Sequence, residues 1–239
     1  MKLKPILLVT IIVLFGSLSF AQNVVITPKK TVYRRPKPLY DLKKTFTVRR
    51  ALAKGATPAL SKKITTAISP EKVLELNIRE EMNEYQWLEE ADYKVLFNRN
   101  GVLCVELWMS GTAAYPDSVT KRVVVNVATG MAVRPADALK NLAGVAKLVK
   151  KAQAAEIAAA TAEMKSDPDA RPEELFSEAN FTASDFGDFA VNATGVTFFY
   201  DYGFPHVLEA LQPSGEFHFT WAQLKPFIRT DGLLARFVR

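Results

Sequence analysis

The sequence contains two histidines, both near its C-terminal end, and they are its clearest candidates for chemistry. His206 and His218 lie close in sequence to the carboxylates Asp201, Glu209 and Glu216. Such a set could bind a metal ion or form an acid–base pair, but its spacing matches no known ligand pattern. The sequence also lacks a nucleophile elbow, a His-Glu-x-x-His helix, a Cys-x-x-Cys pair and a phosphate-binding glycine loop. We therefore expect no catalytic residue, no metal and no cofactor.

An enzyme of unfamiliar type stays open as an alternative, and it would need a polar cleft around His206 and Asp201. His218 is a poor candidate for such a site. It lies in an alternating segment that places Glu216, His218 and Thr220 on one face of a strand, and we expect that face to be exposed to solvent.

Aromatic residues are concentrated between positions 198 and 206. On a strand, Tyr200 and Tyr202 would share a face, and tyrosines can stack on sugars or anchor a protein partner. A second candidate surface is the loop that contains Tyr115. The predicted ligand-binding residues are therefore Tyr115, Tyr200, Tyr202 and His206, and packing in a sheet core is the alternative for Tyr200 and Tyr202.

The single cysteine, Cys104, excludes an internal disulfide, so the fold must be held by packing. Because Cys104 lies in the apolar run Val102–Val105, we predict a buried residue rather than a reactive thiol.

The first twenty-one residues have the three parts of a secretory signal peptide. Lys2 and Lys4 precede the apolar run Ile6–Phe15, and Ser19 and Ala21 supply small residues for cleavage after Ala21. The apolar run is shorter than a spanning helix, although an uncleaved N-terminal anchor is an alternative. We expect a secreted or periplasmic protein with no stable transmembrane segment after cleavage.

The formal net charge is +6, and basic residues gather early in the chain. Residues 22–42 combine them with three prolines, which predicts an extended basic leader without packed structure. A secreted protein meets little nucleic acid, so an anionic envelope polymer or a lipid surface is the better candidate partner. The alternative is a solvated face with no partner.

Periodicity predicts the elements that would position these residues. Asn100-Gly101 supplies the positive φ angles of a tight hairpin turn, and Ser69-Pro70 is a helix start. The expected strands are 44–49, 93–97, 102–109, 119–127, 131–133, 196–202 and 216–220. The expected helices are 59–68, a helix from Ser69 with Leu74, Ile78, Met82 and Tyr85 on one stripe, and 139–164, whose stripe is interrupted by Gln153.

Together these elements predict an α+β fold, in which an antiparallel sheet packs against the long amphipathic helix beside a smaller N-terminal strand–helix part. The expected division is a signal peptide over 1–21, the leader over 22–42, the N-terminal part with the hairpin over 43–110, and a C-terminal part over 111–239. We expect residues 43–239 to form one compact unit.

The segment from Tyr93 to Gly111, then Ala113-Ala114-Tyr115-Pro116, and the strand that ends in Ala128-Thr129-Gly130 resemble the extracytoplasmic domain of RsiV anti-sigma factors. A similar accessory domain occurs in the PdaC peptidoglycan deacetylases. Where that family often has Gly-Ala-His, this chain has Thr112-Ala113-Ala114, so a role tied to that histidine does not transfer. The resemblance implies an α+β, non-catalytic envelope module whose relatives sense lysozyme or accompany peptidoglycan enzymes.

The predicted function is a non-catalytic binding module of the cell envelope that recognises a glycan such as peptidoglycan or a protein such as lysozyme. The alternative is a structural or assembly protein of the envelope that docks through its basic N-terminal leader.

Overall fold

The computed structural model describes residues 23–165 and 170–239, and it shows an α+β protein, as predicted. The described strands are β1 (Val25–Arg34), β2 (Thr45–Lys54), β3 (Leu88–Arg99), β4 (Val102–Thr112), β5 (Pro116–Asn126), β6 (Met131–Ala132), β7 (Phe189–Val191), β8 (Gly195–Phe199) and β9 (Glu216–Thr220). The described α-helices are α1 (Pro58–Ala67), α2 (Pro70–Val73), α3 (Ile78–Asn83), α4 (Pro135–Ala138), α5 (Leu142–Met164), α6 (Pro172–Leu175) and α7 (Trp221–Leu224). Short 3-10 helices are η1 (Asp41–Lys43), η2 (Ala183–Gly187), η3 (His206–Leu211), η4 (Lys225–Phe227) and η5 (Leu233–Phe237).

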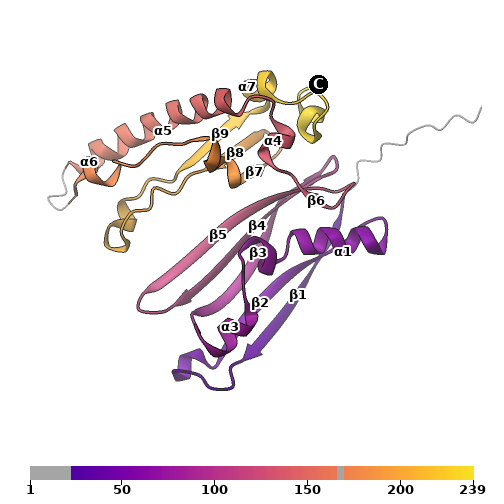
Figure 1. Ribbon diagram of the computed structural model, residues 1–239, viewed down its shortest axis with the longest axis vertical. Helices are drawn as coiled ribbons and strands as arrows, with labels where there is room; N and C mark the ends of the chain where they lie inside the picture. Colours follow the sequence, from indigo (N-terminus) through magenta and orange to yellow (C-terminus); the bar gives the residue numbers. More distant parts are fainter. Residues whose placement is uncertain (1–22, 166–169) are drawn as a thin grey trace, which may run out of the picture.

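The larger sheet runs in the order β1-β2-β3-β4-β5-β6 (Figure 1). All its neighbours are antiparallel except β2 and β3, which form a short parallel pair at Thr47 and Val48. The predicted hairpin is confirmed: Asn100 and Gly101 have φ angles of 53° and 71° between β3 and β4. Both residues therefore adopt the left-handed conformation that a two-residue turn requires.

The prediction of an unpacked leader over residues 22–42 is wrong for its first half. β1 pairs with β2 over its whole length, from Val25 opposite Lys54 to Arg34 opposite Thr45. β1 is the edge strand of the sheet and most of its side chains are exposed on both faces, so it lacks the alternation that marks a half-buried strand. Pro28 is tolerated because proline has no backbone N–H to donate, and an edge strand has one side that needs no donor.

The helix predicted from Ser69 begins as expected but does not continue. The Ser69 side chain accepts a hydrogen bond from the backbone N–H of Lys72, and α2 ends at Val73. Glu75 then has a φ of 57°, and Asn77 caps the separate helix α3. The apolar spacing from Leu74 onward is therefore divided between two helices instead of forming one stripe.

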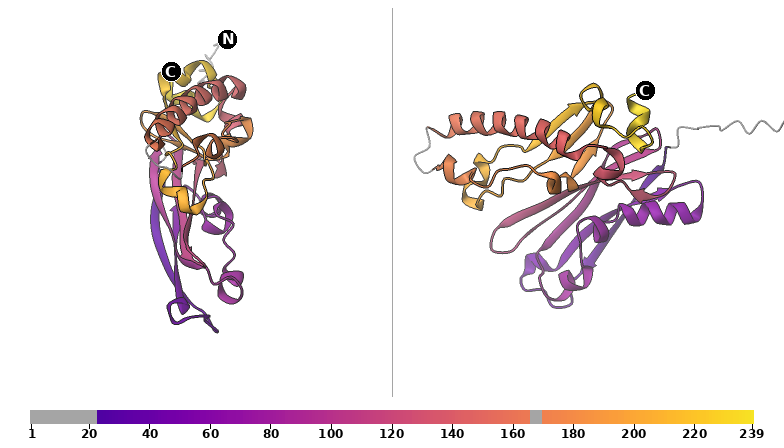
Figure 2. Two further views of the ribbon diagram at one scale, coloured as in Figure 1. Left: turned by 90° about the vertical axis from the view of Figure 1, so that its left-hand side faces the viewer. Right: turned by 45° about the horizontal axis from the view of Figure 1, so that its top comes forward.

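The smaller sheet, β7-β8-β9, forms a second layer together with α5 (Figures 1 and 2). Phe198 on β8 lies opposite Phe189 on β7 and Phe217 on β9, and all three belong to a core cluster with Val145 and Val149 of α5. The long helix therefore packs against a sheet, as predicted.

Gln153 does lie on the buried stripe of α5, with 3% of its surface exposed. Its Oε1 accepts a hydrogen bond from the backbone N–H of Phe181 at 3.0 Å. The polar interruption in the apolar stripe thus fixes the segment that leads into η2.

One core cluster spans the two layers. The cluster that contains the phenylalanines of the small sheet also contains Val102 and Cys104 of β4 and Val124 of β5. The expected division at residues 110 and 111 falls inside β4, close to its end, and β4 pairs with β5 along its whole length. None of the described helices combines the length and the hydropathy needed to cross a membrane. The predicted signal peptide lies outside the described residues.

Candidate functional site

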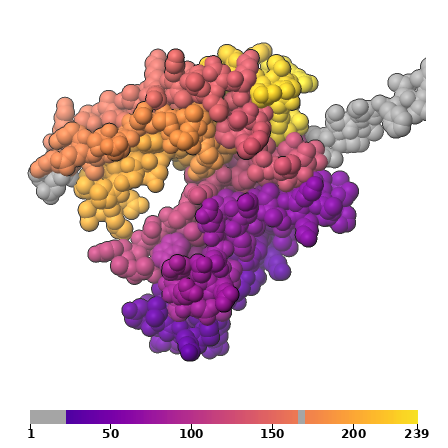
Figure 3. All heavy atoms as spheres, viewed as in Figure 1, coloured from indigo at the N-terminus to yellow at the C-terminus, as the bar shows by residue number. Residues whose placement is uncertain are grey.

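A cleft of about 440 Å³ separates β5 from the far end of the small sheet, and we call it the inter-sheet cleft. One wall is formed by residues 118–122 of β5, and the other by residues 199–201 and 212–216 around the ends of β8 and β9, with Asp188 between them. Figure 3 shows this hollow between the atoms of the small sheet and those of β5. Its volume lies within the range typical of ligand sites.

Arg122 closes the inner end of the cleft through several contacts. Its Nε donates to Glu106 at 2.9 Å and its Nη1 donates to Asp188 at 3.1 Å. Its backbone N–H donates to the other Asp188 oxygen at 2.9 Å. The guanidinium also lies 3.6 Å from the ring centre of Phe199, in a cation–π contact. β5 is thereby tied to both β7 and β8.

Burial raises the pKa of Asp188, and the nearby Arg122 opposes that shift. The carboxylate is therefore held by its arginine partner in partly desolvated surroundings. Because Arg122 is already engaged by two carboxylates and a ring, it serves to shape the cleft, whereas the exposed Lys121 beside it is available to a ligand.

Tyr115 and His206 meet at the outer end of the cleft. Their ring centres are 5.3 Å apart, and the His206 Nε2 lies 3.2 Å from the carbonyl oxygen of Pro116. Tyr115 belongs to the tip of the β4–β5 hairpin, and His206 begins η3. Both side chains are exposed, so two of the four predicted binding residues form a bridge across the open end.

Tyr200 and Tyr202 form a second pair, with ring centres 5.0 Å apart, but β8 ends at Phe199, so both lie beyond the strand that was predicted to carry them. The Tyr200 ring lies against Phe181, and its hydroxyl accepts a hydrogen bond from the backbone N–H of Asn180 at 3.1 Å. Tyr200 also lines the inter-sheet cleft. The Tyr202 hydroxyl donates to Glu156 of α5 at 2.8 Å.

Burial, together with the Glu156 carboxylate, raises the pKa of Tyr202, so this hydroxyl stays protonated. Its ring packs against Phe176 and Phe204. Tyr202 therefore joins the segment after β8 to α5, and Tyr200 forms part of the cleft wall. A binding role for these two tyrosines remains a prediction.

The exposed face predicted for β9 is confirmed, because Glu216, His218 and Thr220 all face solvent. Both ring nitrogens of His218 lie within hydrogen-bond distance of threonine hydroxyls, Thr194 at 3.2 Å and Thr197 at 3.1 Å. Glu216 lies at the cleft wall. The ring of His218 is therefore held in place on the surface of the small sheet.

His206 and Asp201 have different hydrogen-bond partners in the structure. His206 faces Pro116, whereas Asp201 accepts hydrogen bonds from the backbone N–H of Gly203 and from Gln212. Within residues 23–165 and 170–239, no three His, Cys, Asp or Glu side chains are grouped so that they could hold a metal ion.

Cys104 is fully buried, as predicted, and burial raises the pKa of its thiol to about 12.

Five of the early basic residues are paired with acids. Ion pairs join Arg35 to Glu81, Lys43 to Glu89, Lys44 to Asp41, Arg49 to Glu90 and Asp92, and Arg50 to Glu71. Among the described residues, Lys29, Lys30, Arg34, Lys37 and Lys54 make no such pair. The basic excess seen in the sequence is therefore only partly neutralised on the folded surface.

Sequence reasoning missed Arg122, Asp188 and Lys121. Nothing local marks them, because Arg122 and Asp188 are 66 positions apart and meet only when the small sheet packs beside β5. The only signal was the alternation of β5, which places charged residues among valines.

Two solved structures share this fold. A DUF3298 family protein from Pseudomonas aeruginosa PAO1 superposes with a TM-score of 0.57 at 15% sequence identity, covering 87% of this chain and 96% of that chain. A member of the DUF3298 family from Bacteroides fragilis NCTC 9343 gives a TM-score of 0.52 at 11% identity, covering 90% and 99%. At such identities the likeness shows the fold alone.

No protein-family model matches the sequence, and no match was found among curated proteins.

Proposed function

We propose that the protein is a non-catalytic binding module of the cell envelope, and that it takes an extended glycan such as a peptidoglycan strand into the inter-sheet cleft. The observation that carries the proposal is the cleft itself, which is about 440 Å³ in volume and bridged at its outer end by Tyr115 and His206. The predicted signal peptide would deliver the chain to the compartment where such polymers occur.

The lining of the cleft suits a sugar chain. Hydroxyl and amide groups are supplied by Ser118, Thr120, Ser214 and Gln212. Charged groups are supplied by Lys121, Asp201 and Glu216. A sugar offers many hydroxyls to such groups, and the exposed ring of Tyr115 offers an apolar face at the entrance. The resemblance to the accessory domain of the PdaC peptidoglycan deacetylases points to the same class of ligand, whereas the resemblance to the RsiV domain points to lysozyme.

The test is to fill the cleft without disturbing the core. Ser118 is an exposed residue of β5 that lines the cleft, so Ser118→Trp would occupy the space of the ligand. The matched control is Thr27→Trp, because Thr27 is an exposed hydroxyl residue on β1, outside the cleft. The chain from Gln22 onward is incubated with purified peptidoglycan and, in parallel, with immobilised lysozyme.

We expect saturable retention on peptidoglycan at moderate salt, weakened by about tenfold or more in Ser118→Trp and unchanged in Thr27→Trp. Retention on lysozyme alone, with the same dependence on Ser118, would replace the glycan by a protein ligand. Retention on neither, or retention that Ser118→Trp leaves intact, would contradict the proposal.

The alternative role, docking through a free basic leader, is not favoured by a specific observation. Residues 25–34 form β1, and removal of residues 22–42 would therefore delete a strand of the sheet.

A further inference from the structure

The loop between β1 and β2, residues 36–44, exposes large apolar side chains at the end of the molecule opposite α5 (Figure 1), and we call it the distal loop. Leu39 is 64% exposed, Tyr40 72% and Leu42 90%. Tyr85, which is 65% exposed, lies beside them, because the neighbouring Gln86 accepts a hydrogen bond from the backbone N–H of Leu39. Single exposed apolar residues are common, but four at one tip mark an interaction surface.

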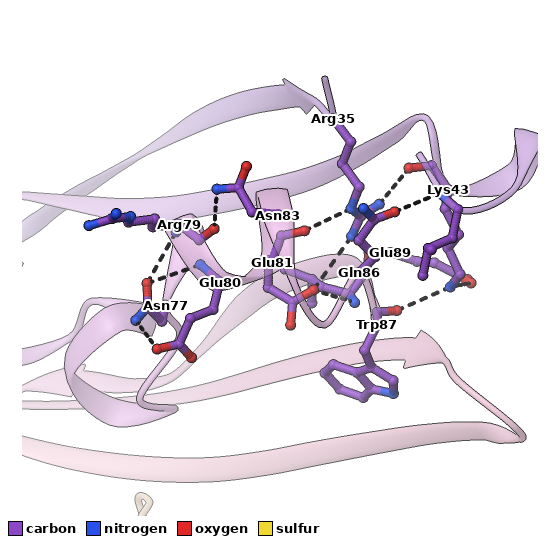
Figure 4. A network of polar contacts seen from close by, with 12 residues as sticks. Arg35, Lys43, Asn77, Arg79, Glu80, Glu81, Asn83, Gln86, Trp87 and Glu89 are labelled. Carbon is purple, nitrogen blue, oxygen red and sulfur yellow. Dashed lines mark hydrogen bonds and ion pairs between the residues drawn. The ribbon is translucent and has the colours of Figure 1, made fainter. Parts of the chain in front are cut away.

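The distal loop is fixed to α3 and β3 by hydrogen bonds of buried side chains (Figure 4). The guanidinium of the buried Arg35 donates to the carbonyl oxygens of Lys43, Glu81 and Leu88 at 2.9, 2.8 and 2.7 Å. The side chain of Gln86 donates to the carbonyl of Lys37 at 2.8 Å. The apolar side chains are therefore presented by an ordered framework.

The ammonium group of Lys43 turns inward in the same framework, where it donates to Glu89 at 2.8 Å and to the carbonyl oxygen of Trp87 at 3.2 Å. Lys43 of the loop and the preceding Arg35 are thus buried, while Leu42 is left at the surface. In an ordinary surface turn the large apolar side chain would be the buried one.

The charges around the tip favour an anionic surface, although weakly. Arg34, Lys37 and Lys44 are exposed beside the apolar residues, against Asp41 within the loop and Glu84 next to Tyr85. Three positive charges minus two negative charges give a net charge of +1 at the tip. Electrostatic attraction to anionic lipid is therefore modest, and insertion of the apolar side chains has to supply most of the binding.

We propose that the distal loop is a membrane-contact site, which inserts Leu39, Tyr40 and Leu42 into the interface of an anionic lipid bilayer. Tyrosine suits this position because its ring is apolar and its hydroxyl is polar. Lys37 and Lys44 can bury their aliphatic stems while their charged ends reach the lipid phosphates. The proposal is independent of the ligand in the inter-sheet cleft.

The test is flotation with vesicles of equimolar phosphatidylglycerol and phosphatidylcholine, compared with vesicles of phosphatidylcholine alone. The chain from Gln22 onward is used, because the apolar residues 6–15 would bind lipid themselves. We expect the protein to float with the anionic vesicles, less strongly at higher salt. Leu42→Ser should lower the partition coefficient by about tenfold or more. Its matched control is Val207→Ser, since Val207 is a similarly exposed residue, 87%, on η3.

Binding that Leu42→Ser leaves unchanged, or no binding by the parent chain, would overturn the proposal. A dimer of the parent chain that Leu42→Ser makes monomeric in sedimentation equilibrium would also overturn it, because the tip would then be a contact between two copies. Folding of both variants is checked by thermal unfolding, and a fully exposed position should leave the midpoint unchanged.

Discussion

Arg35 is the most constrained charged residue among those described. Its side chain has no exposed surface, and it serves three carbonyl oxygens, the Glu81 carboxylate and the face of Phe46. A charge buried in this way costs desolvation energy that only a full set of partners offsets. The network therefore specifies how the distal loop packs on α3 and β3.

Replacing Arg35 by Met should destabilise the fold by about 3–5 kcal/mol, because the buried Glu81 carboxylate would lose its charged partner and keep only the backbone N–H of Leu88, and three carbonyl groups would lose the guanidinium as donor. Lys44→Met is the matched control in the same loop. The ion pair of Lys44 with Asp41 is exposed, so its loss should cost less than about 1 kcal/mol. Urea unfolding measures both changes. Equal changes in the free energy of unfolding would contradict the structural role given to Arg35.

Cys104 should be unreactive in the folded protein. Because burial raises the pKa of its thiol to about 12, almost no thiolate is present near neutral pH. Alkylation followed by mass spectrometry should show Cys104 protected in buffer and modified in denaturant. The comparison is Val207→Cys, which places a second thiol at an exposed position of the same chain. If Cys104 is alkylated as fast as the cysteine introduced at position 207, then β4 opens readily to solvent.

The same pKa shift gives a dependence of stability on pH. A thiol pKa raised in the folded state contributes stability that is fully present below the ordinary thiol value and is lost as pH rises toward about 12.

The β3–β4 hairpin gives a test at the scale of one element. Gly101 has a φ of 71°, where an alanine is strained, so Gly101→Ala should cost about 1–2 kcal/mol. The contact of its new Cβ with the end of the Arg236 side chain adds little, since that side chain can move. Gly187→Ala is the control, because no heavy atom lies within 4 Å of its Cβ position. Thermal unfolding compares the two, and equal midpoints would contradict the turn assignment.

Elements with a strong local signal were predictable from sequence. The Asn100-Gly101 turn, the Ser69 cap and the alternation of β9 each depend on neighbouring residues. β1 was missed because an edge strand with Lys29 and Lys30 exposed shows no buried face. The break at Glu75 was also missed, since a glutamate seldom adopts a positive φ.

The candidate site was less predictable than the elements, because it is assembled from both layers. Tyr115 and His206 were selected separately for their chemistry, and only the packing of the two sheets brings them together. Arg122 and Asp188 carry no motif, and their pairing depends on the contact between β5 and β7. Long-range contacts of this kind leave no trace in the local sequence pattern.

The molecule should unfold in one transition, because a single core cluster joins both layers. Phe198 in the small sheet belongs to the same cluster as Val102 and Val124 of the large sheet. Phe198→Ala should therefore destabilise the whole molecule, by about 3–5 kcal/mol. Hydrogen exchange should show reduced protection of the backbone amides of β4 and β5 as well as of those of β8. Reduced amide protection confined to β7–β9 would reveal two independently folding units.

The contact between Tyr115 and His206 has a consequence for how quickly a ligand binds. Together with the Arg122–Asp188 pair at the other end, it closes the inter-sheet cleft into a ring of protein. A short oligomer with a free end can thread lengthwise through such a ring. A cross-linked polymer has no free end, so it can enter only while the side chains of Tyr115 and His206 are apart. It stays enclosed in the cleft once these two side chains meet again. Association with an intact polymer network would then be limited by the frequency of that opening, and dissociation would be slow for the same reason.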